Sequence, residues 1–114
     1  MSEPLAFEIS PAEVQRRRGA NEPLVLIDVR EPGEYQLARI EGAELIPMRT
    51  VPARLQHLEA ESDRGTLIVY CHHGVRSLNV VSWLRGQGIA NAQSMAGGID
   101  RWSREIDPSV PLYS

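Results

Sequence analysis

The chain has 114 residues, of which 42% are hydrophobic and 24% are charged, and its formal net charge is −3. This length suits one domain around one core, and this composition excludes a disordered, collagen-like or repeat protein. We therefore predict a single domain over residues 5–114. The acidic balance argues against a nucleic-acid partner, because nucleic-acid binders usually carry a basic surplus that meets the phosphates. The basic run Arg16-Arg17-Arg18 is expected to be a solvated helix face.

The chain begins with an acid and a proline, Glu3 and Pro4, where a signal peptide needs positive charge followed by a long apolar run. No uninterrupted apolar stretch approaches the length of a membrane span. The sequence therefore predicts a cytoplasmic protein with no membrane partner. Cys71 is the single cysteine, so it has no partner for an internal disulfide, and its thiol is free for chemistry.

The first predicted helix begins at a capping box. Ser10-Pro11-Ala12-Glu13 combines an N-cap serine, a proline at the first helical position and a glutamate at the third. The helix should run from Pro11 to about Arg18 and end at Gly19. The apolar run Leu24–Val29 that follows has the length of a strand buried on both faces.

Helices and strands then alternate along the rest of the chain. We expect strands over residues 43–46, 66–70 and 92–95. We expect helices over residues 32–40 and 52–61, a helix capped by Ser77 that ends near Gly86, and a last short helix after Gly97-Gly98. Such alternation implies parallel strands with helices on both faces of the sheet, so the predicted fold class is α/β.

Cys71 directly follows the predicted strand 66–70, at the end where open α/β sheets bind their ligands. The loop from Cys71 to Arg76 leads into a helix, so backbone N–H groups can converge on the sulfur, and Gly74 lets the chain turn. Such a nest of amides at the positive end of a helix favours a thiolate, a persulfide anion or a bound oxyanion. An inert buried cysteine would not explain Gly74 and Arg76 at these positions.

His72 and His73 raise the question of a metal site. Adjacent residues seldom point to one ion, and only His57 remains elsewhere in the chain, so we expect no metal. These histidines are expected to shape the loop or to donate hydrogen bonds, with protonation possible near neutral pH.

Three segments resemble the signatures of one known family, the rhodanese-like sulfurtransferases. The first is Ile27–Tyr35 (IDVREPGEY), which continues to Pro47; the second is Tyr70–Ser77 (YCHHGVRS) and the third is Met95–Trp102 (MAGGIDRW). They occur in the family's order and cover nearly the whole chain. The combination of the second segment with the tail after Ile106 is most similar to rhodanese domains fused to E1-like adenylyltransferases of sulfur-carrier pathways.

The resemblance implies a three-layer α/β/α fold with a mostly parallel five-stranded sheet, and a sulfurtransferase that needs no cofactor. Cys71 would take sulfane sulfur from thiosulfate or a protein persulfide, and pass it to a thiol, to cyanide or to a sulfur-carrier protein. The residues of the surrounding loop would be His72, His73, Gly74, Val75, Arg76 and Ser77. Arg76 is expected to bind an anionic donor or to orient the loop.

Three questions stay open from the sequence. Asp28 and Arg30 lie just beyond a core strand and could face the site, but we interpret them first as a brace at the strand end. His72 and His73 stand where thiosulfate-specific relatives often carry cationic side chains, which argues against strong thiosulfate recognition. Two other functions compete with sulfur transfer: a non-catalytic interaction module, and a phosphatase or arsenate reductase, whose loop would have one more residue between cysteine and arginine.

Overall fold

Two adjacent parallel strands, β2 (Leu24–Asp28) and β4 (Thr66–Tyr70), form the centre of the fold in the computed structural model, which describes residues 5–114. The sheet has the order β1-β5-β4-β2-β3, and each neighbouring pair is parallel. The outer strands are β1 (Glu8–Ile9), β5 (Ala92–Met95) and β3 (Glu44–Leu45). The predicted α/β class with a parallel five-stranded sheet is confirmed. The N-terminal segment before Leu5, where Glu3 and Pro4 argued against a signal peptide, lies outside the described residues.

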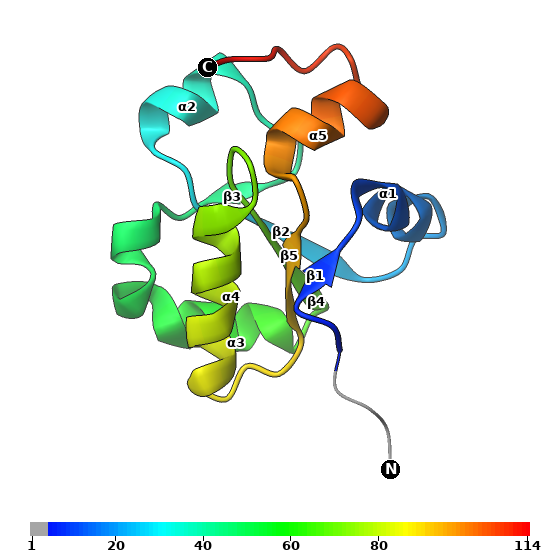
Figure 1. Cartoon of the computed structure of the whole chain (residues 1–114). Helices are drawn as coiled ribbons and strands as arrows, with labels where there is room; N and C mark the ends of the chain where they lie inside the picture. Colours follow the sequence, from blue (N-terminus) through cyan, green and yellow to red (C-terminus); the bar gives the residue numbers. More distant parts are fainter. Residues whose placement is uncertain (1–4) are drawn as a thin grey trace.

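Helices cover both faces of this sheet (Figure 1). They are α1 (Pro11–Gly19), α2 (Pro32–Leu37), α3 (Leu55–Ser62), α4 (Val75–Gly86) and α5 (Gly98–Glu105), with short 3-10 turns at Met48–Thr50 and Pro52–Arg54. Side chains of β4 alternate between two buried clusters: Leu67 and Val69 pack with α3 and α4, whereas Ile68 and Tyr70 pack with α1 and α5. Because strand side chains alternate with period two, one strand serves both cores, and the result is the expected three-layer arrangement.

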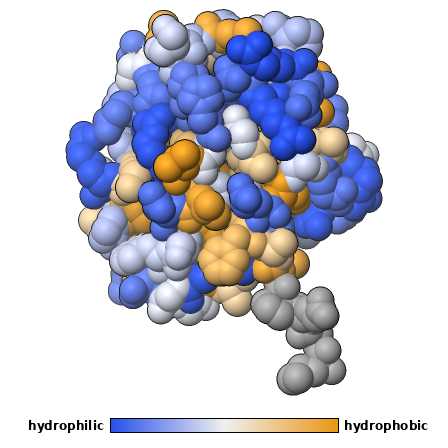
Figure 2. Space-filling model, in the orientation of Figure 1, coloured by the Kyte–Doolittle hydropathy of each residue, from blue (hydrophilic) through white to orange (hydrophobic). Residues whose placement is uncertain are grey.

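Residues along α4 divide between the core and the surface. Val80, Val81 and Leu84 are buried as their helical spacing predicted, whereas Trp83 is 37% exposed. Figure 2 shows that this face of the molecule is mostly hydrophilic, with hydrophobic side chains in small separate patches. Within residues 5–114 no helix is long and apolar enough to cross a membrane.

Three local predictions are corrected by the structure. The residue pattern alone indicated four strands and missed β1, which is only two residues long and is held by pairing of Glu8–Ile9 with β5. The helix expected over residues 52–61 begins as a 3-10 turn and becomes α3 at Leu55. The helix expected over residues 32–40 ends at Leu37, because Ala38 is extended and its carbonyl accepts a hydrogen bond from Arg30 instead of continuing the helix.

That hydrogen bond belongs to a buried ion pair at the end of β2. Asp28 and Arg30 are both 0% exposed, and the guanidinium binds the carboxylate through Nη2 at 2.6 Å and Nε at 2.9 Å. The other Arg30 hydrogen bonds reach the carbonyls of Ala38 and Glu34 and the hydroxyl of Tyr113. Burial alone would lower the pKa of Arg30, but the hydrogen bonds and charge of Asp28 raise it above its usual value. One side chain thus joins β2, α2, the segment after α2 and the C-terminal tail.

Removing the carboxylate should therefore be costly. We expect Asp28→Ala to lower the free energy of unfolding by about 3–5 kcal/mol, since it leaves a buried guanidinium without its counter-ion. The matched control is Arg49→Ala, which breaks the ion pair of Arg49 with Glu31, in which both side chains are more than half exposed. This change should cost about 0–1 kcal/mol. Urea unfolding of the three proteins measures both values, and equal losses would contradict the bracing role of the buried pair.

Candidate active site

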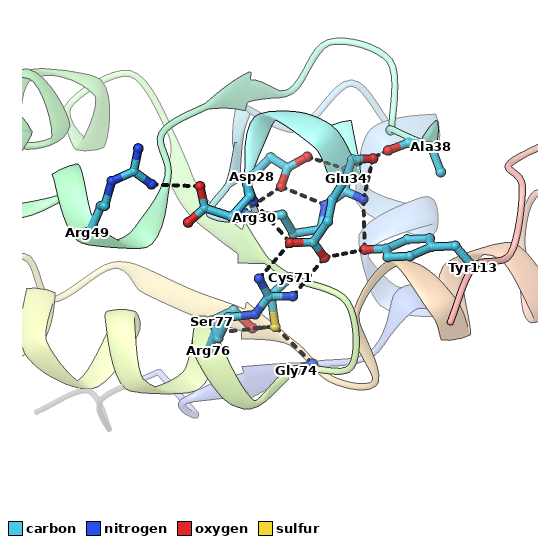
Figure 3. Close-up of polar contacts among 11 residues, drawn as sticks. Asp28, Arg30, Glu34, Ala38, Arg49, Cys71, Gly74, Arg76, Ser77 and Tyr113 are labelled. Carbon is cyan, nitrogen blue, oxygen red and sulfur yellow. Dashed lines mark hydrogen bonds and ion pairs between the residues drawn. The ribbon is translucent and has the colours of Figure 1, made fainter. Parts of the chain in front are cut away.

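The thiol of Cys71 lies at the carboxyl end of β4 and is surrounded by hydrogen-bond donors (Figure 3). Sγ accepts the backbone N–H of Gly74 at 3.1 Å and that of Ser77 at 3.3 Å, and the Ser77 hydroxyl lies 3.4 Å away. Cys71 itself is only 1% exposed. A sulfur held by two amides at the start of a 12-residue helix is in an environment that favours negative charge.

The loop reaches this geometry through its glycine. Gly74 has φ +103°, a left-handed conformation that favours glycine, and it is the residue from which α4 starts at Val75. The prediction that Ser77 caps the helix is wrong, because Ser77 lies inside the first turn of α4. Its N–H is one of the amides that have no partner within the helix, and it donates to Sγ instead. The Ser77 hydroxyl lies 2.7 Å from that of Ser94, a buried residue of β5.

The start of α5 holds the other side of the loop. The N–H groups of Ile99 and Asp100 donate to the carbonyls of Cys71 at 2.9 Å and His72 at 3.1 Å. Gly98 makes this approach possible: its φ is +63°, and a Cβ there would lie 2.5 Å from the Cys71 carbonyl oxygen and still nearer to that of His72. The sequence placed Gly97-Gly98 before the last helix, and the structure shows that Gly98 sets how closely α5 approaches the loop of Cys71.

Arg76 is held by a carboxylate of α2. Its Nη1 and Nη2 donate to the two oxygens of Glu34 at 2.8 and 2.9 Å, and the hydroxyl of Tyr113 donates to the same carboxylate at 2.7 Å. The hydrogen bonds of Arg76, with that of Tyr113 in support, lower the pKa of Glu34 to about 2 against the effect of burial. Of the two roles expected for Arg76, this pairing favours orientation of the loop over capture of an anionic donor.

The rings of the two histidines of the loop contact each other. The ring centroids of His72 and His73 are 3.9 Å apart with a tilt of 31°, and His72 also stacks on Tyr113 at 3.9 Å. Burial, and then the neighbouring His73, lower the pKa of His72, so this ring is neutral at pH 7. Val75 is 70% exposed, so this residue of the loop faces solvent.

These histidines and Asp100 have ligand-capable atoms within 4.8 Å of one another, which adjacency in the sequence did not suggest. A metal ion lies near the plane of each imidazole that binds it, about 2 Å from the nitrogen. The two imidazole planes are tilted by 31° relative to each other, with the ring centroids 3.9 Å apart. Asp100 is also held by Arg104 at 2.9 Å. The absence of a metal at these histidines stays a prediction.

Asp28 and Arg30 lie beside the loop network, but their hydrogen bonds run to Glu34, Ala38, Tyr113 and to each other. This arrangement supports the bracing interpretation. Sequence reasoning missed Ser94, Glu34 and Tyr113 as parts of the site. A polar residue in the strand Ala92–Met95 was a usable indication for Ser94. Tyr113 stands in the tail, where no residue pattern marks it.

The fold and site together define a class: α/β proteins with a cysteine at the end of a central parallel strand, enclosed by amides at a helix start. Comparison with known proteins identifies the family. A sequence model described as "Rhodanese-like domain" matches residues 10–105, so the chain belongs to this family. The family expectation drawn from the three motifs is confirmed.

The chain is similar to proteins of two sizes. It is 34% identical over 114 residues to "Adenylyltransferase and sulfurtransferase MOCS3-2" of Zea mays, covering 96% of this chain but only 24% of that protein. It is 30% identical to a "Sulfurtransferase" of Allochromatium vinosum, covering 90% of this chain and 94% of the other. The crystal structure of a rhodanese-related protein from Thermoplasma volcanium superposes with a TM-score of 0.78 at 30% identity, covering 95% of this chain and all of that one.

Because Gly98 permits the contact between α5 and the loop, no larger residue should be tolerated at this position. We expect Gly98→Ala to lower the free energy of unfolding by about 2 kcal/mol or more, from the left-handed φ and the clash with two carbonyl oxygens. Gly86→Ala is the matched control, since a Cβ there meets nothing within 4 Å. That variant should stay within about 1 kcal/mol of the parent protein in urea unfolding. Similar losses in both variants would contradict the close approach.

The pairing of Glu34 with Arg76 should give the protein a defined acid sensitivity. The pKa of Glu34 is lowered from 4.5 to about 2 in the folded state, so its stabilising contribution is complete above about pH 4.5 and is lost as the pH falls through 2. Between pH 6 and pH 3 we expect the parent protein to lose about 1–2 kcal/mol more stability than Glu34→Gln, allowing for the partial exposure of Arg76. Urea unfolding at the two pH values measures the difference. Glu59→Gln, a substitution at an exposed glutamate, is the control. Parallel losses in the parent protein and Glu34→Gln would refute the coupling.

Proposed function

We propose that the protein is a sulfurtransferase or sulfur carrier that holds sulfane sulfur on Cys71 as a persulfide. The observation that carries this proposal is the pair of amide N–H groups, from Gly74 and Ser77, directed at Sγ with the Ser77 hydroxyl beside them. Membership of the rhodanese-like family and similarity to proteins named sulfurtransferases support it. The chain spans about a quarter of the length of its adenylyltransferase relative.

The reaction would take two steps. In the first, the Cys71 thiolate attacks the outer sulfur of the donor; a new S–S bond forms at Cys71, and the donor's own S–S bond breaks to release sulfite or a thiolate. In the second, a nucleophilic acceptor such as a thiolate or cyanide attacks that outer sulfur; its bond to Sγ breaks, and the electron pair returns to Cys71. The charge on sulfur stays beside the loop amides throughout, so the same donors stabilise thiolate and persulfide.

The burial of Cys71 suits a protein that carries sulfur better than a hydrolase, whose active site must admit water. At 1% exposure the thiol of Cys71 is shielded from water and from stray thiols. Transfer then requires a small donor, or a partner protein that engages the loop. A free and unpaired thiol of this kind also fits the reducing cytoplasm.

The observed loop argues against the phosphatase or arsenate reductase alternative. Four residues separate Cys71 from Arg76, and both terminal nitrogens of Arg76 are bound by Glu34. A phosphoryl group needs a cation and amides around three oxygens, which this arrangement does not supply. The alternative of a non-catalytic module is disfavoured by the retained cysteine and by its donors.

The proposal is tested by mass spectrometry of the intact protein after incubation with thiosulfate and, separately, with glutathione persulfide. We expect a gain of one sulfur atom that dithiothreitol removes, stronger with the persulfide donor because Arg76 is already engaged. Cys71 is the single cysteine, so Cys71→Ser should show no such gain. No adduct from any sulfane donor would overturn the proposal. Hydrolysis of an aryl phosphate that is lost in Cys71→Ser would favour the phosphatase.

A further inference from the structure

The C-terminal tail folds back onto the catalytic loop. Residues 106–114 follow α5 and lie beyond the segment that matches the family, residues 10–105. Figure 1 shows the tail crossing from α5 to α2, where the chain ends. It is anchored on the way: Val110 is buried, and its carbonyl accepts the hydroxyl of Ser103 at 2.5 Å. The tail is therefore part of the folded domain and delivers Tyr113 to the site.

Tyr113 contacts the buried Asp28–Arg30 pair, the carboxylate that holds Arg76, and the loop itself. Its hydroxyl accepts Nη1 of Arg30 at 3.0 Å and donates to Glu34 at 2.7 Å (Figure 3). Its ring stacks on His72 with a tilt of only 10°. Burial, opposed by Arg30 and reinforced by Glu34, raises the pKa of Tyr113 to about 12. The hydroxyl is thus protonated at neutral pH and available as a donor to Glu34.

These contacts reach Cys71 through two routes. Glu34 holds Arg76, which lies in the chain between Gly74 and Ser77, the two residues whose amides donate to Sγ. His72 is the residue next to Cys71, and its carbonyl is bound by the start of α5. Tyr113 therefore contacts the loop directly at His72 and, through Glu34, at Arg76.

We propose that Tyr113 is a positioning residue of the active site: the tail uses it to hold the catalytic loop so that the amides of Gly74 and Ser77 stay directed at Cys71. The hydroxyl acts through Glu34 and Arg76, and the ring acts through His72. The orientation of the amides is independent of the reaction, whereas any effect on sulfur loading rests on the proposed function. Two separate measurements therefore test the orientation of the amides and the effect on sulfur loading.

The first readout is amide hydrogen exchange followed by NMR. Tyr113→Ala should speed exchange of the Gly74 and Ser77 amides about tenfold, and Tyr113→Phe, which keeps the ring on His72, should speed it less. The amide of Ile68 in the centre of β4 should keep its rate. Leu112→Ala is the matched control, since Leu112 is the preceding residue and is 50% exposed. A uniform increase over the whole chain, or unchanged Gly74 and Ser77, would overturn the proposal.

The second readout is a double-mutant cycle on the single-turnover rate of sulfur loading at saturating donor. Tyr113→Phe and Glu34→Gln should each slow loading by about three- to tenfold, and the double variant should be no slower than the worse single variant, because the hydroxyl acts through Glu34. Effects that multiply would refute this route. If the parent protein takes up no sulfur, the proposed function fails, while the exchange rates still decide the role of Tyr113.

Discussion

The structure depends on how the backbone of one short loop is shared between two helices. Carbonyls of Cys71 and His72 are bound by the first amides of α5, while the amides of Gly74 and Ser77 turn to the sulfur. Because the carbonyls are satisfied elsewhere, the N–H groups can converge on one atom. Gly98 makes the contact with α5 possible, and Gly74 makes the turn into α4 possible. The parallel sheet brings these two helix starts to the same edge.

Charged side chains lie near the amides of Gly74 and Ser77 but pair with one another instead of with Sγ. Sγ accepts the neutral amides of Gly74 and Ser77, whereas the guanidinium of Arg76 is bound by Glu34 and that of Arg30 by Asp28. Partial charges from fixed amides stabilise an anion without themselves needing a counter-ion. Such a site suits the sulfur chemistry proposed above, because it stabilises an anion on Sγ without a free cation that would also retain an anionic product.

The buried pair of Asp28 and Arg30 connects this site to the rest of the domain. Its hydrogen bonds run from β2 to α2, to the residue that ends α2, and to Tyr113 of the tail. Burial of both charges is costly, and their mutual bonds together with these neutral acceptors compensate for it. The result is a continuous set of contacts from a central strand, through Glu34, to the loop that carries Cys71.

The sequence by itself determined the alternation of helices and strands, the strand Thr66–Tyr70 and the position of Cys71 at its end, because hydrophobic periodicity and turn residues are local properties. It also pointed to Gly74 and to the family. Only the tertiary structure decided that α4 starts at Val75, that β1 exists and that α2 stops at Leu37. Each of these depends on a partner outside the element itself: Sγ for the amide of Ser77, β5 for Glu8–Ile9 and Arg30 for Ala38. Tyr113 joins the site for the same reason, since its contacts with Arg30 and Glu34 span about 80 residues and have no local pattern.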